Sequence, residues 1–177
     1  SCKLSGSGQP GNSAAGHAWI SAILMVMQRY TRSLFKVSRR LDVSSWHLLS
    51  GSGDGGRPFL RQTADALLAD AARGIRPVPS SEGRQGSHRF AKDRAYFFGK
   101  PAIPGTFDVG LATVRRATCS AKIVLGVFEP SNDHPVMLYA ADVIAVDATG
   151  RPAAPGPALS EAFGSTQTSI KSGQFTL

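Results

Sequence analysis

The sequence predicts an α+β fold in which two N-terminal helices, one of them long and amphipathic, precede an antiparallel β-sheet. Two observations support this prediction. Apolar residues recur at helical spacing in the first part of the chain, whereas from residue 95 onward they form the short runs and alternations typical of strands. Helices followed by strands are typical of α+β folds with an antiparallel sheet. With 177 residues, 42% of them hydrophobic, the chain can bury one core, and we expect a single domain over 1–177.

The first expected element is a helix from about residue 13 to residue 41, within a helical part that covers 12–74. Its apolar side chains alternate spacings of three and four residues and form a heptad seam, made by Ile20, Ile23, Met27, Tyr30, Leu34, Val37 and Leu41. Five basic residues lie roughly opposite this seam on a helical wheel, namely Arg29, Arg32, Lys36, Arg39 and Arg40. The seam is expected either to pack into the core or to pair with a second copy in a homo-oligomer.

A second helix is expected from about 58 to 73, because Pro58 suits a first helical turn and Gly74 suits the position just past the end. Residues 75–89 are rich in Pro, Gly and Ser and are expected to be a linker. The β-rich part covers 95–177. Its expected elements are strands near 96–98, 107–111, 121–128, 136–146 and 168–177, a turn at 130–133 and a short helical piece near 158–163.

The charge of the chain is positive and unevenly distributed. The formal net charge is +8 and the pI is about 10.1. Residues 1–41 hold six basic residues and no acid, and 76–116 hold eight basic residues against three acids. Residues 89–100 also interleave basic and aromatic side chains, as single-stranded nucleic-acid sites do. Such clusters attract polyanions, and the side chains expected to bind one are Arg29, Arg32, Lys36, Arg39, Arg40, Arg89, Lys92, Arg94 and Lys100.

The first functional interpretation is therefore a non-enzymatic basic binding or assembly protein whose partner is nucleic acid or another polyanion. A peripheral membrane protein that uses the amphipathic basic helix is a further interpretation. The enzymatic alternative rests on Cys119 and His134, which flank an apolar strand, since a thiol beside a base becomes a nucleophile. Their spacing resembles the Cys–His pairs of bacterial deamidase toxins and chemoreceptor glutamine deamidases. That resemblance implies a small exported bacterial effector with deamidase-like or amidase-like thiol chemistry.

Several classes of feature are not expected. The four histidines lack metal-ligand spacing, so neither a metal nor a cofactor is predicted. The longest apolar run, 20–27, is far shorter than the roughly 20 residues of a membrane span, so no transmembrane segment is predicted. The first residues lack a charged region followed by an apolar run, so no signal peptide is visible and a soluble protein is expected, with its location open.

Overall fold

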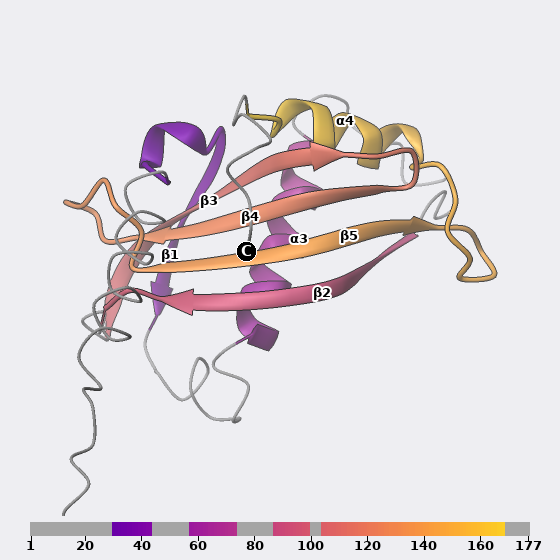
Figure 1. The fold of residues 1–177 in the computed structure, drawn as a ribbon. Coiled ribbons are helices and arrows are strands. Elements are labelled where there is room, and N and C mark those ends of the chain that lie inside the picture. Colours follow the sequence, from indigo (N-terminus) through magenta and orange to yellow (C-terminus); the bar gives the residue numbers. More distant parts are fainter. Residues whose placement is uncertain (1–29, 44–56, 74–86, 100–103, 169–177) are drawn as a thin grey trace, which may run out of the picture.

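The structure is a computed structural model that describes residues 30–43, 57–73, 87–99 and 104–168. These residues build one antiparallel sheet of five strands in the spatial order β1-β3-β4-β5-β2. The strands are β1 (Val37–Val43), β2 (Ser87–Phe97), β3 (Gly105–Arg116), β4 (Ser120–Phe128) and β5 (Met137–Val146). Helix α3 (Arg57–Arg73) follows β1 in the chain and crosses one face of the sheet, with α4 (Pro157–Ser165) packed beside it (Figure 1).

The main core lies between α3 and the sheet. The buried side chains of α3 recur at helical spacing and form one apolar stripe, made by Leu60, Ala64, Leu67, Leu68 and Ala71. Alternate residues of β5, such as Tyr139, Ala141 and Val143, point toward this stripe, because successive strand side chains point to opposite faces. Each fully buried Leu of the stripe contributes about 1.5–3 kcal/mol through its removal from water. The central strands are therefore held firmly against α3.

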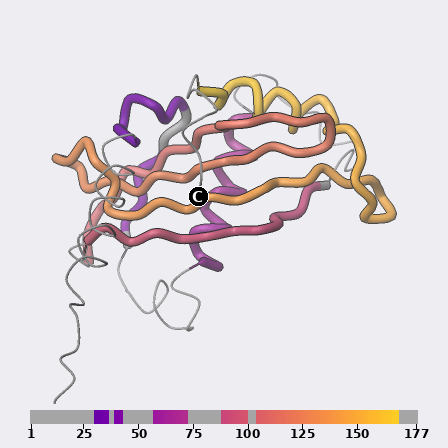
Figure 2. Tube along the Cα trace, in the orientation of Figure 1, coloured from indigo at the N-terminus to yellow at the C-terminus, as the bar shows by residue number. Residues whose placement is uncertain are grey.

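A smaller core covers the opposite face of the sheet. The 3-10 helix η1 (Arg32–Leu34) and the adjacent residues lie over this face near the β4–β5 turn (Figure 2). The ring of Phe35 occupies a slot above Gly110 and Gly126, which are paired across β3 and β4. Phe35 also meets the ring of Phe128 edge-on, with centroids 5.2 Å apart. The slot exists because neither glycine carries a Cβ.

Replacing Gly110 with Ala is expected to destabilise the protein by about 1–3 kcal/mol through overpacking. The new Cβ would lie 2.5 Å from Cβ of Phe35, an atom next to the backbone that cannot turn away. Urea unfolding followed by circular dichroism measures the loss. Gly99→Ala is the matched control, since nothing lies within 4 Å of its added Cβ. Equal unfolding midpoints for the two variants would contradict the described packing of Phe35.

The expected order of two N-terminal helices before the sheet is wrong. Residues 37–41 of the expected first helix belong to β1, which pairs antiparallel with β3 along its whole length. The apolar residues Val37 and Leu41 fit helical spacing, but together with Val43 they also fit the alternation of a strand. Pairing with β3 decides between the two periods, as tertiary contacts often override local preference. Residues 13–29 of the expected helix lie outside the described residues.

The remaining elements agree better with the sequence. The helix expected at 58–73 is present as α3, the strands expected at 121–128 and 136–146 are present as β4 and β5, and α4 includes the expected helical piece. The expected linker 75–89 is wrong at its C-terminal end, because Ser87 already pairs with Val146 in the ladder of β2 and β5. Of the strand expected at 168–177, only Thr168 is among the described residues.

Candidate active site

A polar groove opens between α3 and the edge strand β2. Its volume is about 610 Å³. Arg57, Arg61 and Asp65 line one side of it, because residues four apart share one face of a helix. Strand β2 supplies the other side with His88, Phe90 and Asp93. The groove thus brings five titratable side chains and an aromatic ring to the junction of the main helix and the sheet edge.

A histidine–carboxylate pair lies in this groove. His88 Nε2 is 2.7 Å from Asp65 Oδ1. His88 is opposite Ala145 of β5, whose side chain belongs to the core under α3, so the register directs the imidazole toward the helix. The imidazole also meets the ring of Phe90 edge-on, at 5.6 Å between centroids. A carboxylate and an imidazole in contact and open to a cavity can take up and release protons during a reaction.

A β-bulge aims a second carboxylate at the groove. Between the pairs Ala91–Asp142 and Arg94–Ala140, two residues of β2 face one residue of β5. Lys92, in the bulge, has a positive φ of 46°. The bulge reverses the alternation of β2 and turns Asp93 toward α3. There Asp93 Oδ2 accepts hydrogen bonds from Tyr139 Oη at 3.1 Å and from Arg61 Nη2 at 3.0 Å.

The hydrogen bonds of this network keep Tyr139 protonated and Asp93 ionised. Burial, together with the nearby charge of Asp93, raises the pKa of Tyr139 to about 12, so the phenol remains a hydrogen-bond donor. Burial alone would raise the pKa of Asp93, but the hydrogen bonds from Tyr139 and Arg61 outweigh it and hold that pKa below its usual value. The guanidinium of Arg61 lies 5.8 Å from the centre of the Phe90 ring. Arg61 is therefore a positioned, permanently charged cation beside Asp65.

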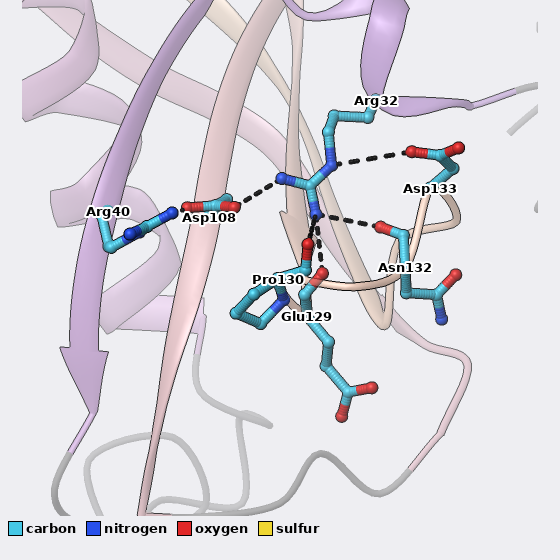
Figure 3. A network of polar contacts seen from close by, with 7 residues as sticks. All are labelled: Arg32, Arg40, Asp108, Glu129, Pro130, Asn132 and Asp133. Atoms are coloured by element: carbon cyan, nitrogen blue, oxygen red, sulfur yellow. Dashed lines mark hydrogen bonds and ion pairs between the residues drawn. The ribbon is translucent and has the colours of Figure 1, made fainter.

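A second polar network lies on the opposite face of the sheet (Figure 3). Arg32 Nη2 donates to the carbonyl oxygens of Glu129 at 2.6 Å and Asn132 at 3.0 Å, and Nη1 bonds to Asp108. Arg40 Nε donates to the other oxygen of Asp108 at 3.1 Å. The hydrogen bonds from Arg32 and Arg40 hold the pKa of Asp108 below its usual value. This network joins η1 to the sheet and to the β4–β5 turn.

The basic residues expected to bind a polyanion do not form one surface. Arg32 and Arg40 both bond to Asp108 in the network described above, and Arg39 lies 3.8 Å from Asp70 in an exposed ion pair. Lys36 is exposed beside β1, while Arg89, Lys92 and Arg94 are exposed on β2. Because β1 and β2 are the two edge strands, these groups lie on opposite edges of the sheet. Arg29 and Lys100 lie outside the described residues.

Cys119 and His134 are not brought together. Cys119 precedes β4, is half-buried, and accepts a hydrogen bond on its carbonyl oxygen from Ala145 N at 2.8 Å. His134 follows β4 in an exposed turn, where its N–H donates to Asn132 Oδ1. The length of β4, with about 3.3 Å of rise per residue, separates the two residues by more than about 25 Å. The structure therefore contradicts joint thiol chemistry by this pair.

Comparisons with known proteins identify the fold. Neither a known protein family nor a curated protein sequence matches the chain. The PA5185 protein from Pseudomonas aeruginosa strain PAO1 superimposes with a TM-score of 0.64 at 17% identity, covering 80% of this chain and 98% of that chain. A thioesterase from Thermus thermophilus, complexed with coenzyme A and Zn, gives 0.53 at 19% identity, covering 73% and 92%. A 1,4-dihydroxy-2-naphthoyl-CoA thioesterase from Synechocystis gives 0.56 at 8% identity, covering 72% and 95%.

The fold shared with these proteins is the hotdog fold, in which an antiparallel sheet packs around a central helix, here α3. This finding overturns the interpretation as a nucleic-acid-binding protein and the interpretation as an exported thiol effector. No helix of the described segments has both the length and the apolar character that a bilayer span requires. Across the same segments, His, Cys, Asp and Glu side chains form no group of three that could hold a metal ion.

Sequence reasoning missed Asp65, His88 and Asp93. The spacing of Arg57, Arg61 and Asp65 along one helix face was a visible signal. His88 and Asp93 fell in or next to the expected linker, and nothing in the sequence marks them as neighbours of that helix face.

Proposed function

We propose that this protein is an enzyme that hydrolyses acyl thioesters, with CoA thioesters as the substrate class, in the groove between α3 and β2. The observation that carries the proposal is the contact between Asp65 and His88, 2.7 Å apart and open to a cavity of about 610 Å³. The solved structures that share the fold and are named thioesterases support the same class of reaction. The net charge of +8 favours the approach of anionic CoA esters.

The reaction follows from the two side chains. Asp65 accepts a proton from a water molecule while the water oxygen forms a bond to the carbonyl carbon of the thioester. His88, with its proton on Nε2, donates a hydrogen bond to Asp65 Oδ1 and so holds the carboxylate in place. The carbon–sulfur bond then breaks, and the proton taken from water passes to the departing thiolate. The products are a carboxylic acid and a free thiol.

We further expect the protein to be a dimer in which a second copy of the chain pairs along the edge of β2. In the described part of the sheet, β2 pairs only with β5, which leaves its outer edge beside the groove. Phe97, near the end of this strand, is 39% exposed and is the large hydrophobic side chain most open to water among the described residues. Edge strands are commonly covered by another element or chain. A partner paired along β2 would extend the sheet and narrow the open side of the groove.

Light scattering is expected to give the mass of a dimer for the wild-type protein. Phe97→Asp is expected to raise the dissociation constant of the dimer about tenfold or more, because it places a charge in an apolar contact. Thr149→Asp, in the exposed turn after β5, is the control for an added charge. A wild-type protein that stays monomeric at high concentration would refute pairing along β2.

The proposed activity is tested with the full chain and a set of acyl-CoA esters that includes short, aromatic and long acyl groups. Release of free CoA is followed with a thiol reagent, and turnover of the best substrate is expected at about 1 s⁻¹ or faster. Formation of the matching acid is confirmed by mass spectrometry. If none of the esters is cleaved faster than in buffer, the proposal is wrong.

A further inference from the structure

We propose that the acyl group of the substrate itself carries a carboxylate, so that the enzyme acts on short dicarboxylic acyl thioesters, and that Arg61 binds this carboxylate. The inference rests on the proposed thioester hydrolysis and names the class of acyl group. It is carried by the position of Arg61, by the way the guanidinium is held, and by the few apolar groups that line the groove.

The position of Arg61 suits an acyl carboxylate. Arg61 and Asp65 line the same groove, one helical turn apart, which corresponds to a rise of about 6 Å along α3. Asp65 activates the water that attacks the thioester carbonyl, so this carbonyl lies near Asp65. A carboxylate placed a few methylene groups beyond the carbonyl reaches about one helical turn along the groove. Arg61 lines the groove one helical turn from Asp65 and so can meet such a carboxylate.

The guanidinium is fixed without being covered. Asp93 takes a hydrogen bond from Nη2 and is itself held by the buried Tyr139. Within this ion pair the side chain of Asp93 is 14% exposed and that of Arg61 is 47% exposed, so Arg61 is the member more open to the groove. A guanidinium has five N–H donors in a planar fork that matches a carboxylate. Positioning by Asp93 lowers the entropy lost when a second carboxylate binds.

The charges around the groove favour an anion at this end. Arg57 lies one helical turn from Arg61, on the side away from Asp65. Two positively charged side chains therefore line this end of the groove. Asp93 offsets part of this charge from the other side of the groove. The apolar groups among the lining residues are Pro58 and the ring of Phe90, over which Arg61 already lies. A long alkyl chain would have to lie against charged side chains, which is unfavourable.

The test compares succinyl-CoA with butyryl-CoA, which carries a methyl group where succinyl-CoA carries the carboxylate. The wild-type protein is expected to prefer succinyl-CoA by about tenfold or more in kcat/KM, chiefly through a lower KM. Arg61→Gln is expected to abolish this preference, and Arg61→Lys to restore part of it. Arg94→Gln is the matched control, because the register places Arg94 on the opposite face of the same strand; the preference should survive this substitution.

The remaining outcomes of this comparison separate the inference from the proposed function. A wild-type protein that cleaves both esters equally well keeps the proposed function but refutes the carboxylate site. An equal loss on both esters in Arg61→Gln would assign Arg61 to a group they share, such as the CoA phosphates. If neither ester is cleaved, the wider set of acyl-CoA esters decides the proposed function, and calorimetric binding of these two esters decides the inference. Tighter binding of succinyl-CoA than butyryl-CoA, lost in Arg61→Gln, supports it, whereas equal affinity or no binding refutes it.

Discussion

Replacing Asp65 with Asn is expected to lower kcat for acyl-CoA hydrolysis by about 10²–10⁴-fold, the usual contribution of a general base. The amide has nearly the same size and can still bond to His88, so the groove keeps its shape. It cannot accept a proton from water at neutral pH, however, and the attacking oxygen is no longer activated. KM is expected to change little, because the substitution removes an interaction made in the transition state.

Asp70→Asn is the matched control for this substitution. Asp70 lies on the same helix and pairs with Arg39 at 3.8 Å, and it is absent from the residues that line the groove. Its kcat is expected to stay within about twofold of the wild type, since exposed pairs contribute little. Thermal unfolding of both variants verifies that they are folded. If Asp65→Asn retains most of the wild-type kcat, Asp65 is not the base and the catalytic carboxylate must be sought elsewhere.

The parts of the fold that could be predicted have an unambiguous period or an uninterrupted apolar run. Helix α3 shows its stripe of Leu60, Leu67 and Leu68 directly in the sequence. Strand β4 is an apolar run long enough for a buried strand. Strand β1 could not be predicted, because its few apolar residues fit a helix as well as a strand. Strand β2 is polar, and the bulge between Ala91 and Arg94 breaks the alternation by which a strand is recognised.

The candidate site depends on contacts that the sequence does not encode locally. Asp65 and His88 are separated by the end of α3 and by the segment that precedes β2, and they meet only because β2 pairs beside β5 under the helix. The positive net charge can be read from the sequence, but the partners of the individual basic side chains cannot. Arg32 and Arg40 bond to acceptors within the fold, and a count of basic residues cannot distinguish such groups from those that face a ligand.

Replacing Arg32 with Ala is expected to destabilise the protein by about 2–4 kcal/mol, because several polar groups lose their partner at once. Asp108 would keep only Arg40 of its two arginine partners in this network, and the carbonyl oxygens of Glu129 and Asn132 would each lose the hydrogen bond from the guanidinium (Figure 3). Arg32→Lys should recover only part of the loss, since an ammonium cannot reproduce the guanidinium fork. Arg39→Ala, which breaks an exposed pair, is expected to cost less than about 1 kcal/mol.

The pH dependence of that loss tests its origin. Asp108 has a lowered pKa in the folded protein, so its contribution is fully present above its unfolded pKa of about 3.9 and is lost as the pH falls through the folded value. Arg32 supplies part of this shift, so the difference in unfolding free energy between the wild type and Arg32→Ala should narrow below about pH 4. Bonds from Arg32 to carbonyl oxygens do not titrate and should persist. A difference that is constant across this range would show that the carbonyl contacts, rather than the ion pair with Asp108, hold η1 on the sheet.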